Sequence, residues 1–242
     1  MREWFAEVER QFILNFVKDD RWEFLLNGLF VTLRITFFAL IIGIVIGIVI
    51  AVVRSSYDKN EASMRQGLGR FILGFFNRIC KIYLTVIRGT PVVVQLMIFY
   101  FVILVSVRDG ETIGIIAFGI NAGAYIAEIF RSGIMSVDIG QFEAGRSLGL
   151  NYVQTMWYII IPQAFKTILP TLANEFIVLL KETAVVGYLA VQDITKAGHI
   201  IGGRTYSWLM PLLAVALVYL VLVMFFTWLV GKLERRLRAS ER

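Results

Sequence analysis

Long runs of apolar residues along the chain have the length of membrane-spanning helices. Three of them carry no charged side chain, at residues 35–53, 90–107 and 208–230. Two further apolar segments, at about 113–134 and 157–182, contain a few polar side chains. A helix of about 20 residues crosses the roughly 30 Å apolar core of a bilayer. The pattern therefore predicts five membrane-spanning helices.

Composition supports this picture and excludes several kinds of site. Hydrophobic residues make up 58% of the chain and charged residues only 17%, which is typical of an all-α integral membrane protein. The chain has one cysteine, Cys80, so it cannot form an intrachain disulfide. It has one histidine, His199, so it contains no cluster of cysteines or histidines that could bind a metal. The net charge of +6 does not indicate nucleic acid, because the basic residues gather beside apolar segments.

Residues 1–23 carry apolar side chains at helical spacing, with charged residues between them. The apolar positions are Phe5, Val8, Phe12 and Phe16. This spacing predicts a helix that lies in the membrane interface, with a fully solvated amphipathic helix as the alternative. No small-residue cleavage site ends the stretch, so we expect it to be retained. No repeat or linker divides residues 24–242, which we expect to form one domain.

Basic residues predict the orientation of the helices. The connection at 54–81 has an excess of them: Arg54, Lys59, Arg65, Arg70, Arg78 and Lys81 against Asp58 and Glu61. A second group follows the last predicted span: Lys232, Arg235, Arg236 and Arg238. Loops rich in lysine and arginine stay in the cytoplasm. We therefore expect the N-terminus outside, and the C-terminus and a loop at about 135–156 in the cytoplasm.

Polar side chains inside two predicted spans line up on one face of each helix. The first set is Asn121, Tyr125, Glu128 and Ser132, and the second is Thr167, Thr171, Asn174 and Lys181, with Glu175 beside it. A charge in mid-membrane costs about 2.5–3.5 kcal/mol on insertion scales, so these faces should look into the bundle or a wet cavity. We expect the following residues to bind substrate: Asn121, Glu128, Asn174 and Glu175. A structural alternative stays open, in which Glu128 pairs with Arg131 and Glu175 pairs with a lysine or with backbone freed at Pro170.

Glycine and proline interrupt the predicted helices at defined points. Pro91 removes a helical hydrogen bond and Gly89 loosens the helix before it, so the second span should be kinked or broken there. We interpret Gly89 and Pro91 as a hinge, with a fixed kink as the alternative. Gly43 and Gly47 form a G-x-x-x-G pattern, which favours close packing of a neighbouring helix.

One long polar insert separates the third and fourth predicted spans, Glu143-Ala144-Gly145-Arg146-Ser147-Leu148-Gly149. Its small residues permit close approach by another surface. Glu143 places a carboxylate near the start of a short helix, where the helix dipole favours negative charge. Gly149 is expected to supply an unusual backbone conformation at the end of that helix. The insert is therefore predicted to dock on another protein.

This insert resembles the cytoplasmic loop of ABC-importer permeases, in which Glu-Ala-Ala is followed after three residues by Gly and after nine more by Ile-x-Leu-Pro. The match runs from Glu143 to Pro162, with Gly145 in place of the second Ala and Ile161 in place of Leu. Three further stretches are similar to the branch of the family that carries polar amino acids: Arg88-Gly89-Thr90-Pro91, Tyr125 to Arg131, and Lys181-Glu182-Thr183.

The resemblance implies the five-helix fold of a type I importer permease in a bacterial cytoplasmic membrane. It also implies a permease dimer with a second copy or a related chain, ATPase subunits that bind ATP and Mg, and an extracytoplasmic amino acid binding protein. The residues expected to couple the permease to the ATPase are Glu143, Ala144, Gly145 and Gly149. The chain has no Gly-x4-Gly-Lys-Ser/Thr phosphate loop, so we expect ATP hydrolysis in the separate ATPase subunit and no catalytic site here. With one cysteine and one histidine, we also expect no metal or cofactor in this chain.

The predicted function is ATP-driven import of polar amino acids. We expect a slight preference for basic amino acids, because Glu128 and Glu175 could hold a cationic side chain. A gated ion channel or ion-coupled carrier is the alternative, in which the same carboxylates relay protons or cations. The docking insert favours the importer, since a channel has no need of it. The polar stripes disfavour a membrane scaffold without transport.

Overall fold

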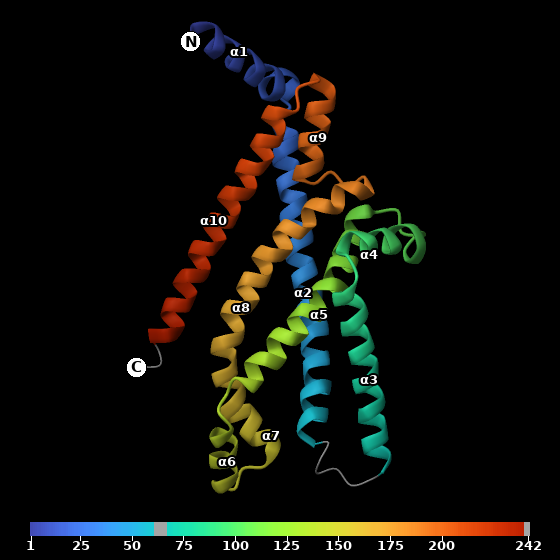
Figure 1. Cartoon of the computed structure of the whole chain (residues 1–242), viewed down its shortest axis with the longest axis vertical. Helices are drawn as coiled ribbons and strands as arrows, with labels where there is room; N and C mark the ends of the chain where they lie inside the picture. The colour runs from blue at the N-terminus through green and yellow to red at the C-terminus, as the bar shows by residue number, and fades with distance from the viewer. Residues whose placement is uncertain (61–66, 240–242) are drawn as a thin grey trace. The chain divides into compact units, whose positions relative to one another are not determined.

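The computed structural model describes residues 1–60 and 67–239, and every regular element in these two ranges is helical (Figure 1). The α-helices are α1 Arg2–Phe12, α2 Trp22–Asn60, α3 Leu68–Gly89, α4 Val92–Ile98, α5 Gly110–Met135, α6 Ile139–Ser147, α7 Tyr152–Thr155, α8 Ile161–Glu182, α9 Ile194–Thr205 and α10 Leu209–Ala239. Short π-helical turns lie at η1 Ile13–Val17, η3 Phe99–Ile103 and η4 Met156–Ile160, and 3-10 turns at η2 Lys18–Asp20 and η5 Thr183–Leu189. The predicted all-α class is confirmed.

Three helices in the described ranges are long and apolar enough to cross a membrane. They cover Trp22–Asp58, Gly110–Met135 and Leu209–Leu237, and the broken pair Leu68–Gly89 and Val92–Ile103 would make a fourth span. Helix α8, which covers most of the fourth predicted span, is not among them. It carries four charged residues, Lys166, Glu175, Lys181 and Glu182, which lower its hydropathy. The count of five spans and their orientation remain predictions.

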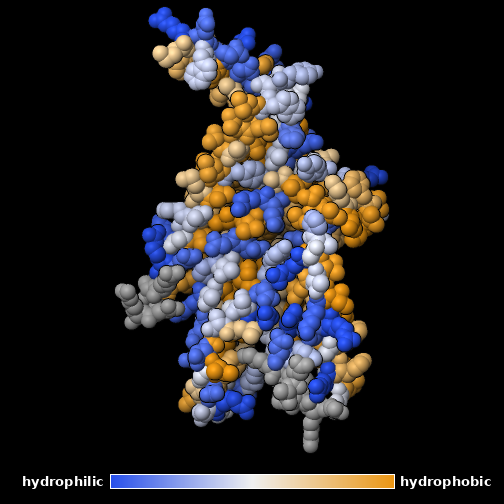
Figure 2. Space-filling model, viewed as in Figure 1, coloured by the Kyte–Doolittle hydropathy of each residue, from blue (hydrophilic) through white to orange (hydrophobic). Residues whose placement is uncertain are grey.

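The connection predicted at 54–81 is mostly helical. Helix α2 continues to Asn60 and α3 begins at Leu68, so Arg54 lies near the end of α2 and Arg70 near the start of α3, whereas Arg78 and Lys81 lie in the middle of α3. Apolar side chains at helical spacing run along one exposed face of α3 (Figure 2): Phe71, Ile72, Phe75, Phe76, Ile79, Ile82 and Val86. This periodicity makes the segment an amphipathic helix, and a count of charges alone missed it. Glu61 and Arg65, and the side chains of Lys59 and Arg238, lie outside the described part of the chain.

The chain forms two compact units, each built from three separate stretches. The first comprises Met1–Ala39, Val93–Phe118 and Ile177–Trp228. Within it, α9 packs against the beginning of α2. The amide of Ile194 donates to the hydroxyl oxygen of Thr32 at 3.3 Å, and a Cβ atom on Gly28 would lie 2.7 Å from the carbonyl oxygen of Asp193. Backbones in such close contact fix the position of α9 on α2.

The N-terminal residues are attached to this first unit through one buried side chain. Helix α1 has no buried residue, whereas Asn15 in η1 is fully buried. Asn15 donates to the hydroxyl of Ser207 at 3.2 Å and accepts from the hydroxyl of Thr205 at 2.7 Å. Satisfied buried polar groups of this kind hold two segments in one arrangement. The interfacial position of residues 1–23 and the single domain at 24–242 stay predictions.

The second unit comprises Leu40–Val92, Gly119–Phe176 and Leu229–Arg242. Its centre is the contact of α2 with α5. A Cβ atom on Gly47 would lie 2.9 Å from the amide nitrogen of Ala127, and one on Gly43 would lie 3.0 Å from the Cβ of Ala122. The close packing predicted from the G-x-x-x-G pattern is confirmed. The hydroxyl of Tyr83 on α3 donates to the carbonyl of Ile120 and so ties a third helix to the pair.

Replacement of Gly47 by alanine should destabilise the protein by about 1–3 kcal/mol, because the new methyl group meets the backbone of α5. A matched control is Gly231→Ala on α10, where a Cβ atom would meet no neighbour within 4 Å. The control should be neutral or slightly stabilising, since alanine is the better helix former. Thermal unfolding of both variants in one detergent tests this. Equal melting temperatures would contradict the packing argument.

Candidate functional site: a basic cleft and an exposed loop

A cleft of about 580 Å³ lies among α2, α3 and α5 in the second unit. Its lining consists of Arg54, Lys81, Leu84, Thr85, Arg88, Gly89, Tyr125 and Glu128. The guanidinium of Arg88 lies 5.7 Å from the centroid of the Tyr125 ring, which is a cation–π geometry. Three cationic side chains and one carboxylate thus line the cleft. Its charge favours a ligand that carries an anionic group.

Glu128 is paired with Arg131 on the next turn of α5. Arg131 donates to the two carboxylate oxygens of Glu128, from Nη2 at 2.7 Å and from Nε at 3.2 Å. Its Nη1 also lies 3.8 Å from Oδ2 of Asp58. The pairing considered as the structural alternative is therefore confirmed. The Glu128 side chain remains 33% exposed and a carboxylate can accept several donors, so the pair orients Glu128 without occupying it fully.

The other predicted substrate residues lie in the same unit but outside the lining of the cleft. Asn121 on α5 is 3% exposed, whereas Asn174 on α8 is exposed and Glu175 is half-buried. Helices α5 and α8 touch where Gly133 meets Ile168. The chain reverses direction between these helices (Figure 1), so the four predicted residues lie on the same side of that contact. Only the glutamate on α5 lines the cleft.

Sequence reasoning did not assign Arg54, Lys81 and Arg88 to the site. It treated Arg54 and Lys81 as signals of membrane orientation and Arg88 as part of a family motif. Lys81 and Arg88 are seven residues apart, which places them on one face of a helix. That spacing could have indicated that Lys81 and Arg88 line one site. It was missed because residues 54–81 were interpreted as a connection between helices.

The helix break predicted before Pro91 is present. Helix α3 ends at Gly89, and Thr90 has extended backbone angles, φ −121° and ψ 147°. The hydroxyl of Thr90 donates to the carbonyl of Val86 at 2.8 Å, which satisfies one of the acceptors left free at a helix end. A new helix then begins at Val92. A hinge movement at Gly89 and Pro91 stays a prediction.

The polar insert forms a short helix, α6, with a defined beginning and end. The Asp138 carboxylate accepts from the amide of Gly140 at 2.7 Å at its start. At its end, the amide of Leu150 donates to the carbonyl of Gly145 at 3.1 Å and that of Gly149 to the carbonyl of Arg146 at 2.9 Å, the Schellman pattern. Gly149 has φ +78°, which confirms its predicted backbone role.

Gly145 is small for a reason inside the loop itself. It is buried, and a Cβ atom on it would lie 2.6 Å from Cγ2 of Thr155 on α7. The rings of Phe142 and Tyr152 stack 6.3 Å apart in the same contact, and burial raises the pKa of the Tyr152 hydroxyl. Glu143 and Ala144 are exposed. Glu143 and Ala144 are therefore accessible to a partner protein, as predicted for the loop, whereas Gly145 packs within the chain.

Comparison with known proteins shows the family. The sequence profile of the family described as "Binding-protein-dependent transport system inner membrane component" matches residues 67–239. The chain belongs to this family. It is a permease subunit of an amino acid ABC importer, as the sequence resemblance implied. The channel alternative gains no support from this match.

Relatives and solved structures agree with the family. The chain is 36% identical to the arginine transport system permease protein ArtQ of Bacillus subtilis, over 90% of this chain and 94% of that one. It is 35% identical to the putative glutamine transport system permease protein GlnP of Rickettsia typhi, over 88% and 93%. A crystal structure of an amino acid ABC transporter with histidines aligns with a TM-score of 0.78 at 38% identity, over 88% and 94%. The MetNI methionine ABC transporter shares the fold, with a TM-score of 0.75 at 20% identity over 91% and 99%.

Substitution of Gly145 by alanine should separate α6 from α7, at a cost of about 1–3 kcal/mol, because the methyl group overlaps Thr155. Thr155→Ala removes both Thr155 atoms that lie within 3 Å of that methyl position, at 2.6 and 2.9 Å. The double variant should therefore regain most of the protection from hydrogen exchange that Gly145→Ala loses. Hydrogen exchange over residues 139–160 of the single and double variants measures this. Unchanged exchange in Gly145→Ala would contradict the contact.

Proposed function

We propose that this permease imports polar amino acids, with a preference for basic ones, and that it forms the translocation pathway as a dimer with a second copy or a related permease. The cleft lined by three cationic side chains and Glu128 is the observation that carries the proposal of a polar amino acid substrate. The preference for basic ones rests on the carboxylates of Glu128 and Glu175 alone. The names of its relatives, an arginine and a putative glutamine permease, are consistent with a polar substrate.

The groups in the second unit match the two ends of an amino acid. A substrate carboxylate fits beside Arg88 and Lys81, because charge-assisted hydrogen bonds of this kind are the strong ones. The ammonium group needs acceptors, which Glu128 offers. Asn121, Asn174 and Glu175 lie further along the α5 and α8 faces and would contact the side chain as it moves. A second carboxylate among them supports the preference for a basic side chain.

Movement of substrate requires a change of shape coupled to ATP. We place the coupling at the loop around α6, where Glu143 and Ala144 are exposed and the backbone is fixed by Gly145 and Gly149. The partner there is an ATPase subunit that binds ATP and Mg. Within residues 1–60 and 67–239 no group of three or more His, Cys, Asp or Glu side chains could hold a metal ion. The break at Gly89 and Pro91 is the proposed hinge.

The remaining proposed features concern the cell. An extracytoplasmic binding protein would deliver the amino acid to the outer face of this multi-pass protein in the bacterial cytoplasmic membrane. The N-terminus would lie outside and the C-terminus inside, with five helices crossing the lipid bilayer. Helix α8 would be the least apolar of the five. Its charged residues are then acceptable only if they face the bundle or its water-filled pathway.

Removal of the Glu143 carboxylate should uncouple transport from ATP hydrolysis. Glu143→Ala is expected to lower substrate-stimulated ATPase activity and uptake in proteoliposomes by about fivefold or more, as for loss of about 1 kcal/mol at an interface. Gly149→Val should act similarly, because a branched residue strains the left-handed backbone by about 1–2 kcal/mol. Glu234→Ala on α10 is the charge-matched control. Normal coupling in both loop variants would reject the assignment.

Loss of charge at the cleft should change substrate preference. Glu128→Gln is expected to lower arginine uptake by about tenfold, since a hydrogen bond to a charged group contributes about 1.5–3 kcal/mol, and to affect glutamine uptake less. Glu175→Gln should change arginine uptake in the same direction. Uptake of arginine, glutamine and glutamate is measured with each binding protein supplied and assembly verified. Absence of arginine uptake, or no effect of either variant, would contradict the proposed preference for basic amino acids. The assignment as an importer would not be affected.

A further inference from the structure

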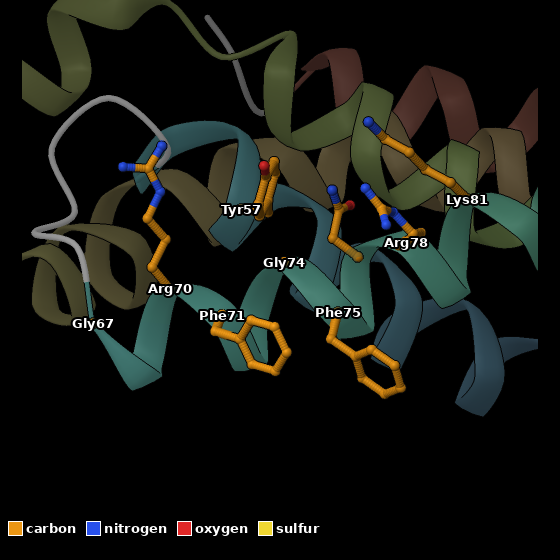
Figure 3. Close-up of a pocket in the computed structure, with 9 residues that line it drawn as sticks. Tyr57, Gly67, Arg70, Phe71, Gly74, Phe75, Arg78 and Lys81 are labelled. Carbon is orange, nitrogen blue, oxygen red and sulfur yellow. The ribbon is translucent and has the colours of Figure 1, made fainter.

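A second cavity, which the proposed transport cycle does not use, lies between the end of α2 and the first half of α3. Its volume is about 640 Å³. The residues that line it are Tyr57, Gly67, Arg70, Phe71, Gly74, Phe75, Asn77, Arg78 and Lys81. Figure 3 shows the side chains of Arg78 and Lys81 on one side of α3, and the rings of Phe71 and Phe75 on the other. The cavity is thus basic at one edge and aromatic at another.

The basic edge carries three cations that have no ion-pair partner within residues 1–60 and 67–239. Arg70, Arg78 and Lys81 are exposed, and no carboxylate in the described residues forms an ion pair with any of them. Asp58, on the last turns of α2, is engaged by Arg131 at 3.8 Å. Three cations for which the described residues supply no ion-pair partner attract an anion, and the planar guanidinium of Arg78 matches phosphate geometry well.

Asn77 places a second, independent requirement on the ligand, which must donate a hydrogen bond. Its side chain lines the cavity, is 3% exposed, and has a carbonyl oxygen without a hydrogen-bond partner in the described part of the chain. A buried acceptor without a partner costs about 1–3 kcal/mol, so a ligand that donates a hydrogen bond is favoured. Gly74 leaves the space for such a ligand, since even a Cβ atom on it would lie 3.7 Å from Tyr57.

The aromatic edge continues into an apolar surface. Phe71 and Phe75 are 73% and 55% exposed, and the exposed apolar face of α3 extends from them along the helix (Figure 2). A ligand that is anionic and hydroxylated at one end, and apolar at the other, would satisfy all three parts of the cavity. Basic pockets beside membrane helices bind phospholipid headgroups by this combination.

We propose that this cavity binds one anionic glycerophospholipid of the phosphatidylglycerol type. The lipid phosphate lies against Arg78 and Lys81, and a hydroxyl of its glycerol headgroup donates to Asn77. Arg70, about 12 Å further along α3, adds positive charge at the other end of the cavity (Figure 3). The acyl chains follow the rings of Phe71 and Phe75. Because Lys81 also lines the basic cleft, the bound lipid neutralises a charge that the cleft shares, which links membrane composition to the charge of the candidate substrate site.

The test is a lipid titration of the full-length permease in detergent, followed by native mass spectrometry. Dioleoyl phosphatidylglycerol should bind more tightly than dioleoyl phosphatidylcholine. The triple variant Arg70→Gln, Arg78→Gln, Lys81→Gln should weaken the phosphatidylglycerol complex on the order of a hundredfold, at about fivefold for each charge removed. The matched control removes three cations from α10, Lys232→Gln, Arg235→Gln and Arg236→Gln, and should bind as the unmodified protein does.

Two further variants separate a built cavity from diffuse surface charge. Gly74→Leu fills the space without a change of charge and should weaken phosphatidylglycerol binding about as strongly. Asn77→Leu should reduce the preference for phosphatidylglycerol over phosphatidic acid, which lacks the glycerol hydroxyls. Size-exclusion profiles confirm that each variant is folded, and soluble glycerol phosphate should not displace the lipid.

Several outcomes would overturn the proposal. Equal weakening by both triple variants would show that only overall charge matters, and unchanged binding by Gly74→Leu would show that the cavity is not occupied. Displacement by glycerol phosphate would indicate a site for a free anion. If no lipid preference exists and the cavity triple variant instead loses the ATPase subunit on purification, the surface docks a protein and the lipid assignment is wrong.

Discussion

Backbone contact between helices is the constraint on which each unit of this protein depends. In a bilayer, apolar side chains gain little from leaving lipid for a neighbouring helix, so helices associate by close van der Waals packing and interhelical hydrogen bonds. Glycine permits both. Gly47 brings the backbone of α2 against α5 in the second unit, and Gly28 brings α2 against the start of α9 in the first. A hydroxyl adds an interhelical hydrogen bond in each unit, from Tyr83 on α3 to α5 in the second and to Thr32 on α2 from the start of α9 in the first.

Close packing of α2 on α5 decides where the charges of α3 can go. Helix α3 has one apolar face, which is exposed, and an opposite face that carries Lys81 and Arg88. The hydroxyl of Tyr83, which lies on a different side of α3 from Lys81 and Arg88, binds α3 to α5. With α3 held in this way, Lys81 and Arg88 line the cleft beside α2 and α5. Helix α3 thus supplies all the cations that line one cavity and two of the three that line the other, and Lys81 belongs to each.

The sequence predicted features that follow from local rules and missed those that depend on neighbours. The break before Pro91, the G-x-x-x-G contact and the backbone of Gly149 each rest on a property of a few consecutive residues, and all three are present. Helix α3 was missed because its basic residues were counted as a charge excess, and the helical spacing of the residues around them was not considered. The location of Arg54 beside Glu128 could not be predicted, since it depends on how α2 and α5 pack. The exposure of Asn174 depends in the same way on the packing of α8.

The loop around α6 shows how tertiary contacts divide roles among residues of one motif. Gly149 is required by its φ of +78°, and Gly145 by its contact with Thr155, so two of the motif's small residues act within the chain. Leu148 between them is 78% exposed, and Ile139 and Val153 are 75% and 70% exposed. Exposed apolar residues around a short, well-capped helix are typical of a protein contact. A partner at this loop would therefore meet a rigid surface of Glu143, Ala144 and Leu148, whose shape is set by the two glycines that it does not need to touch.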